Sequence, residues 1–112
     1  MSARPAGLDG TLAALAETNR RRVVDLLAER PRAAGELARL LDLPAPTMSR
    51  HLRILRESGL VEESHPEFDA RVRIYALRPE PMEQLKRWLE EAERMWAEQL
   101  AAFKTYLETK AR

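Results

Sequence analysis

The chain has 112 residues, of which 45% are hydrophobic and 33% are charged, and its formal net charge is +1. This length and composition suit one compact soluble domain and are too small for two domains of ordinary size. There is no cysteine, which excludes disulfides, thiolate metal sites and thiol redox sensing within the chain. No apolar run approaches the roughly 20 residues of a membrane span, and residues 1–10 lack the apolar core of a signal peptide. We therefore expect a cytoplasmic protein without membrane contact.

The N-terminal region predicts a short arm followed by helices. Residues 1–8 have the composition of a flexible N-terminal arm, and residues 9–112 are expected to form a single domain. Asp9 or Thr11 could cap a first helix, since both side chains can accept a backbone hydrogen bond. Thr18 is a good N-cap for a second helix, in which apolar residues recur at helical spacing.

A helix-turn-helix is predicted next. Pro31 ends the second helix, and a third helix is expected from about Ala33. Residues 42–44 predict a tight turn, and Pro46 suits the first turn of a fourth helix. Two helices joined by so few residues have the proportions of a helix-turn-helix.

The fourth helix carries the strongest functional signal in the chain. Met48, Leu52 and Leu55 are spaced i, i+4 and i+7, so they form an apolar spine on one face. Gly59 is expected to end the helix in a left-handed conformation. The other faces are polar or basic, with no acid before Glu57, and carry Thr47, Ser49, Arg50, His51, Arg53 and Arg56. Such a surface suits the edges of a DNA major groove, whereas the alternative is an amphipathic helix with solvated arginines.

A change of sequence period after the fourth helix predicts a β-hairpin. Residues 60–64 and 72–77 have the pattern of short strands, and residues 66–71 form a polar turn between them. A hairpin directly after a recognition helix is the arrangement called a wing.

Residues 80–109 then predict one uninterrupted helix about 40 Å long. Its apolar stripe is too wide to be covered by one small domain, so a second copy of the chain is the simplest cover. The expected dimer interface consists of Leu12, Leu15, Leu85, Trp88, Leu89, Trp96 and Phe103. The alternatives are packing within the monomer and a pocket for an apolar small-molecule effector, which the sequence does not specifically indicate.

The predicted DNA contacts come from three parts of the chain. Arg50 and Arg53 project opposite the apolar spine, toward guanine edges or phosphates. Arg71 at the wing suits a narrow minor groove, with a solvated turn arginine as the alternative. His51 either donates to a phosphate or packs at the edge of the helix. The full set is Pro46, Thr47, Ser49, Arg50, His51, Arg53, Arg71, Arg73 and Arg20, although at least one arginine among residues 20–22 is expected to make an internal ion pair.

Catalysis and metal binding have little support. Ser49 and His51 are two residues apart on a helix, so their side chains diverge and no proton-transfer geometry follows. His51 and His65 are the only histidines, and a zinc site would need further ligands that the sequence does not place. We expect neither an enzyme nor a metal or cofactor site.

The order of these elements resembles the winged-helix repressors of the ArsR/SmtB family. The segments that carry the resemblance are residues 15–16 and 20–27 of the second-helix region, 35–38, 47–61 and 71–75, within an overall match of residues 12–105. Glu17-Thr18 replaces the Asp-Pro pair of many members. The third helix lacks a Cys-x-Cys site and residues 80–112 contain no histidine, so the metal-sensing activity of some members is not expected here.

Together these features predict an α+β, mainly α fold: a winged helix-turn-helix with a β-hairpin wing and a long C-terminal dimerisation helix. The expected function is a homodimeric transcriptional repressor that binds double-stranded DNA at an inverted repeat, with residues 46–58 of each subunit in one major groove. The alternative is a winged-helix protein-interaction module that acts through its long C-terminal helix without binding DNA.

Overall fold

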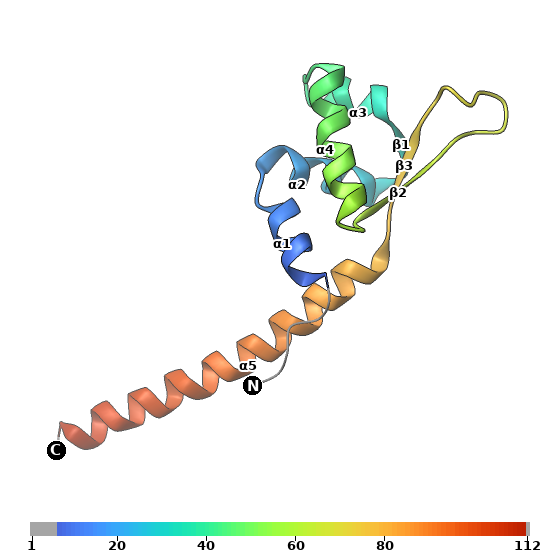
Figure 1. The fold of residues 1–112 in the computed structure, drawn as a ribbon. Coiled ribbons are helices and arrows are strands. Elements are labelled where there is room, and N and C mark those ends of the chain that lie inside the picture. The colour runs from blue at the N-terminus through green and yellow to red at the C-terminus, as the bar shows by residue number, and fades with distance from the viewer. Residues whose placement is uncertain (1–6, 112) are drawn as a thin grey trace.

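The computed structural model describes residues 7–111, which form five helices and three strands (Figure 1). In chain order these are α1 (Leu8–Leu15), α2 (Thr18–Glu29), β1 (Arg32–Ala33), α3 (Ala34–Leu40), α4 (Ala45–Glu57), β2 (Val61–Ser64), β3 (Ile74–Leu77) and α5 (Pro79–Lys110). The fold is a mainly helical α+β winged helix-turn-helix with a long C-terminal helix, which confirms the predicted fold class.

The first helix begins earlier than the sequence pattern indicates. Residues 1–6 of the expected arm lie outside the described residues, but Leu8 is buried and is the first residue of α1. Gly7 precedes it with φ 88°, a left-handed conformation that glycine adopts at little cost. This turn starts the helix without a side-chain cap, so the prediction of Asp9 or Thr11 as N-cap is wrong. Both residues lie inside α1, where the Thr11 hydroxyl donates to the Gly7 carbonyl over 3.2 Å.

The second helix is also capped by a different residue from the one predicted. Thr18 is the first residue of α2, and Glu17 occupies the N-cap position with extended backbone angles. The Glu17 carboxylate accepts a 2.9 Å hydrogen bond from the backbone N–H of Arg20. A glutamate side chain can therefore satisfy a first-turn amide here, and Thr18 is not needed as the cap.

The wing is part of a three-stranded antiparallel sheet with the order β1-β3-β2. The predicted hairpin is present, and its register pairs Val61 with Leu77 and Ser64 with Ile74. Its second strand starts two residues later than expected. The sequence pattern missed β1, because two residues are too short for a periodicity. They form a strand because the central β3 offers them an edge on which to pair.

The core lies where the helix-turn-helix meets the sheet. Met48, Leu52 and Leu55 are each at most 1% exposed, so the predicted spine of α4 is buried. Around it lie other buried side chains: Ala14, Val23, Leu27, Leu37, Leu41, Leu60, Val61 and Tyr75. Gly59 has φ 82° directly after α4, as predicted, and this left-handed turn directs the chain into β2. With its spine buried, α4 must present its opposite face to solvent.

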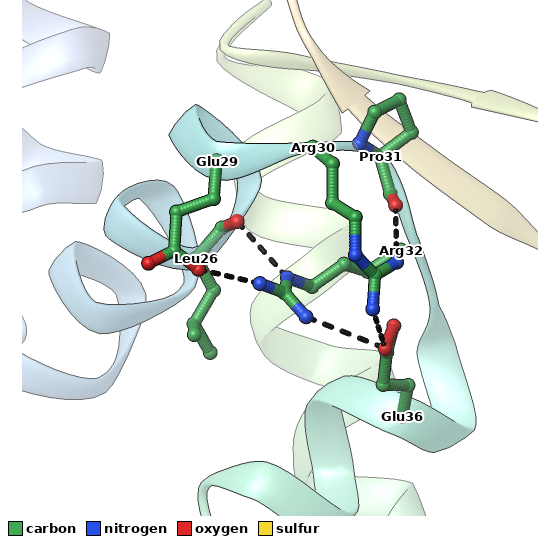
Figure 2. A network of polar contacts seen from close by, with 6 residues as sticks. All are labelled: Leu26, Glu29, Arg30, Pro31, Arg32 and Glu36. Atoms are coloured by element: carbon green, nitrogen blue, oxygen red, sulfur yellow. Dashed lines mark hydrogen bonds and ion pairs between the residues drawn. The ribbon is translucent and has the colours of Figure 1, made fainter.

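A polar network ties α2, β1 and α3 together (Figure 2). At its centre is Arg32, which is only 9% exposed. Its Nε donates to the Leu26 carbonyl over 3.0 Å, and its terminal nitrogens lie 2.5 Å from Glu29 and 3.3 Å from Glu36. Arg30 also donates to Glu36, over 2.6 Å, but its side chain is 57% exposed. The buried arginine therefore holds the start of the helix-turn-helix against α2.

Helix α5 extends away from the rest of the fold (Figure 1). It has 32 residues, about 48 Å at the usual helical rise, and the molecule measures 74 Å along its longest axis. All residues of α5 are described, and none is buried. Its contact with the body includes α1. Among the described residues, no helix is apolar over a length that would cross a membrane.

Candidate nucleic-acid interface

Helix α4 presents the predicted polar face on the surface. Pro46, Arg50 and Arg53 are exposed, and Thr47 and Ser49 are half-buried. Because the cap residue is a proline, no side chain there bonds the first-turn amides. These amides and the helix dipole favour an anion at this end. The face therefore combines donors for phosphates with side chains that can read base edges.

A groove of about 460 Å³ runs between α4 and the sheet. Its lining consists of Pro46, Ser49, Arg50, Arg53, Arg56, Glu63, Arg73 and Tyr75. Five of these residues belong to the predicted DNA-binding set and come from two segments of the chain. Four arginines on one groove create a local positive potential although the chain has a net charge of only +1.

The wing is joined directly to α4 by a side-chain hydrogen bond. The Arg73 guanidinium donates to the Ser49 hydroxyl over 3.1 Å. Both residues were predicted as DNA contacts, and the structure brings them together across 24 residues of sequence. One consequence is that Ser49 has a fixed orientation toward the groove. The other is that Arg73 is held at the groove wall.

A second connection between wing and helix centres on Glu63, which sequence reasoning did not identify. Its carboxylate accepts from Arg56 Nη1 over 2.6 Å and from the Tyr75 hydroxyl over 2.8 Å. Burial raises the pKa of the Tyr75 hydroxyl, and the hydrogen bond to Glu63 raises it further. The available signal was strand geometry: Glu63 is two residues after the buried Val61, hence on the same face, and lies opposite Tyr75 in the hairpin.

Comparisons with known proteins agree with this geometry. A family model described as a helix-turn-helix domain matches residues 15–64. A solved structure of an ArsR family transcriptional regulator has 32% sequence identity and a TM-score of 0.76, covering 87% of this chain and 97% of its own. An ArsR-like transcriptional regulator from Rhodococcus sp. RHA1 has 28% identity and a TM-score of 0.79, with 93% of each chain covered. The HTH-type transcriptional regulator Rv2034 of Mycobacterium tuberculosis is 36% identical over 90 residues, 80% of this chain and 78% of the relative.

The chain belongs to the ArsR family of helix-turn-helix transcriptional regulators. The family consists of DNA-binding regulators and not of enzymes, so α4 is the recognition helix and the β2–β3 hairpin is the wing. Within residues 7–111, the structure contains no group of three or more histidine, aspartate, glutamate or cysteine side chains that could hold a metal ion.

Two predicted DNA contacts lie on the inner side of the recognition helix. Arg20 Nε donates to the Ala14 carbonyl over 2.7 Å, and its Nη1 lies 3.3 Å from Nδ1 of His51. The His51 side chain is 12% exposed, with the Glu17 carboxylate 4.0 Å from Nδ1. A guanidinium can only donate, so Nδ1 accepts and the ring proton belongs on Nε2. The geometry supports a positioning role for Arg20 at the junction of α1, α2 and α4, and its contact with DNA remains a prediction.

The wing loop carries a highly exposed predicted DNA contact. The side chain of Arg71 is 93% exposed, and its Nε lies 3.2 Å from Asp69. The same carboxylate oxygen accepts from the Arg71 backbone N–H over 3.0 Å. Asp69 therefore shapes the turn and holds the arginine in place, and solvent screens the exposed pair.

Proposed function

We propose that the protein is a homodimeric repressor that binds an inverted-repeat operator through α4 and the wing of each subunit. The observation that carries this proposal is the groove between α4 and the wing, where four arginines surround Ser49. Arg50 and Arg53 would read base edges or bind phosphates in the major groove, and the amide end of α4 would approach a phosphate. Thr47 and Pro46 would enter with that end of the helix.

The exposed stripe on α5 supports the dimer. Leu89, Trp96 and Phe103 follow one another at intervals of seven residues, which places them on one helix face, and they are 48%, 62% and 58% exposed. Leu12, which is 39% exposed, belongs to α1, the helix that contacts α5. Large apolar side chains at this density need a partner surface, and a second copy supplies an identical stripe. Leu85 and Trp88 are half-buried, and Leu15 packs against the core, so they would complete the edge of the interface.

Dimerisation would also set the distance between the two recognition helices on DNA. Two recognition helices related by a twofold axis fit half-sites about 34–36 Å apart, one turn of the duplex. A dimer bound beside a promoter would exclude RNA polymerase, which is the basis for assigning repression.

Selection of bound sequences from a random DNA pool tests the proposal. We expect an enriched inverted repeat and an affinity that falls steeply with salt, because arginines displace condensed cations from phosphates. A chain that self-associates but binds no DNA would contradict the proposal and support the protein-interaction alternative.

Arg50→Ala tests base readout. We expect binding to the selected operator to weaken by about 1–3 kcal/mol, with relaxed preference at one position, if Arg50 makes a bidentate base contact. Fluorescence anisotropy with single-base operator variants measures both effects. Arg87→Ala is the matched control, because Arg87 is exposed on α5 away from the groove. Unchanged operator affinity in Arg50→Ala would remove Arg50 from the interface.

Arg71→Ala tests the wing. We expect weaker binding and a decrease of about one in the slope of log affinity against log salt, if the side chain neutralises one phosphate. Asp69→Asn keeps a turn-forming side chain but removes the charge that faces Arg71, so this variant is expected to bind DNA more tightly than the wild type. Identical affinity and salt slope in Arg71→Ala and the wild type would contradict a DNA contact by this arginine.

A further inference from the structure

The tip of the wing carries an aromatic side chain that the fold does not use. Phe68 is 89% exposed, more than any other large hydrophobic residue among those described. The exposed apolar residues of α5 follow one stripe that a second copy could cover, but Phe68 lies apart from them, in the loop between β2 and β3. Its exposure therefore needs a separate explanation.

The loop that presents Phe68 is braced by hydrogen bonds on both sides of it. The backbone N–H of Asp69 donates to the Pro66 carbonyl over 3.3 Å, and that of Val72 donates to the Asp69 carbonyl over 3.2 Å. At the base of the loop, Nδ1 of His65 lies 3.0 Å from the Val72 carbonyl. These contacts lower the entropy that the tip would lose on binding.

The base of the wing is joined to the recognition helix by side-chain contacts. Arg73 bonds to Ser49 on one side of the groove, and Glu63 bonds to Arg56 on the other. In Figure 1 the loop and the start of α4 lie toward the same end of the molecule, away from α5. When α4 lies in a major groove, we expect the wing loop to reach the adjacent minor groove, as the N-terminal arm of a homeodomain does.

Charge at the tip constrains what Phe68 can meet. Asp69 is offset by its ion pair with Arg71, whereas among residues 7–111 no ion pair offsets Glu67, which is exposed. Apart from the phosphate contact proposed for Arg71, a tip with one uncompensated acid would gain little from phosphates. An apolar contact deep in a groove would have to supply the affinity, and phenylalanine is one of the side chains that insert between base steps in the minor groove.

We propose that Phe68 is an apolar wedge that inserts at a base step in the minor groove flanking each half-site, with Arg71 beside it. This inference rests on the proposed DNA-binding function. It makes the wing tip a specificity element that reads how easily a step unstacks. Flexible pyrimidine–purine steps such as TA would be favoured over stiff A-tracts, which cost more to deform.

The test combines two proteins with two operators. Wild type and Phe68→Ala are titrated against operators that differ only in the flanking step under the wing, TA in one and an A-tract in the other. We expect the wild type to prefer the TA operator, and Phe68→Ala to bind it about tenfold more weakly and to lose the preference. 2-Aminopurine at the flanking step should brighten when the wild type binds, because unstacking relieves its quenching, and should stay dark with Phe68→Ala.

Two further variants sharpen the test. Phe68→Leu retains an apolar wedge and should keep most of the preference for TA. Glu67→Gln should strengthen binding to both operators, because it removes a negative charge beside the DNA. Since Phe68 and Glu67 are exposed, we expect these variants to melt like the wild type.

The outcomes separate the wedge from the function on which it rests. A wild type that shows no sequence-specific DNA binding would contradict the proposed function. A wild type that binds its operator without brightening 2-aminopurine, or a Phe68→Ala variant with wild-type affinity and wild-type preference for TA, would overturn the wedge alone. In that case the tip would serve a contact with something other than the base step.

Discussion

Trp96→Glu is expected to convert the proposed dimer into monomers that bind operator DNA poorly. Trp96 is 62% exposed near the middle of the apolar stripe on α5, with Leu89 and Phe103 one heptad to either side. In a dimer this position would lie in the seam between two helices, where an unpaired carboxylate is strongly disfavoured. The two half-sites would then be bound independently, and we expect operator affinity to fall by about a hundredfold or more.

Sedimentation at micromolar concentration and operator titration measure the two effects of Trp96→Glu. Ala97→Glu is the matched control: it adds the same charge one residue later, about 100° around the helix, at an exposed position. We expect that variant to remain a dimer and to bind its operator. Arg50 and Arg53 are unchanged in both variants, so lost binding would follow from lost assembly. A wild type that sediments as a monomer at this concentration would contradict the interface and the two-half-site arrangement.

Arg32→Ala is expected to lower the free energy of unfolding by about 3 kcal/mol, whereas Arg30→Ala should lower it by less than about 1 kcal/mol. Both arginines bond to Glu36, and the shorter contact belongs to Arg30, at 2.6 Å against 3.3 Å. Burial, and not the length of the contact, decides which variant loses more stability. The Arg32 side chain is 10% exposed and also satisfies the Leu26 carbonyl, which its loss would leave without that partner, whereas the Arg30 side chain is 57% exposed and screened by water.

Denaturant unfolding at one fixed protein concentration measures this difference, because a dimer's apparent stability depends on concentration. Equal losses for the two variants would contradict the role assigned to burial. A loss in Arg30→Ala larger than that in Arg32→Ala would show that contact length dominates.

The same network predicts a pH dependence. The hydrogen bond from Arg30 lowers the pKa of Glu36, and the charges of Arg30 and Arg32 lower it further, while burial acts in the opposite direction. A carboxyl whose pKa is lower in the folded state contributes stability above its unfolded pKa and loses it as the pH falls through the folded value. The stability gap between the wild type and Arg32→Ala should therefore narrow when Glu36 is protonated. A gap that is constant from neutral to acidic pH would show that the carboxylate charge is not involved.

Comparison of prediction and structure shows which features depend on local pattern. The spine of Met48, Leu52 and Leu55 was predictable because helical spacing alone places these side chains on one face. The end of α4 at Gly59 was predictable because few other residues adopt its left-handed backbone conformation at low energetic cost. Helix starts were less predictable. Gly7 and Glu17 begin helices for which side-chain rules favoured other residues, since several local groups can satisfy the same amides.

The groove shows the limit of local pattern more clearly. The sequence indicated that Ser49, Arg50 and Arg53 share the exposed side of a helix and that Arg73 belongs to a wing. It did not indicate that Arg73 would bond to Ser49, or that Glu63 would join Arg56 to Tyr75. Nor did it indicate that Arg20 and His51, both predicted as DNA contacts, would contact each other.

Local sequence was enough to predict the order of the helices and of the hairpin, the buried face of α4, the basic character of its exposed face and the apolar stripe of α5. These follow from periodicity and composition, which act over a few residues. Long-range packing selects which arginines face the groove and which are held by internal acceptors, and it adds a two-residue strand to the sheet. Those outcomes depend on residues far apart in the chain, because a guanidinium bonds to whichever acceptor the packing of the core brings within reach.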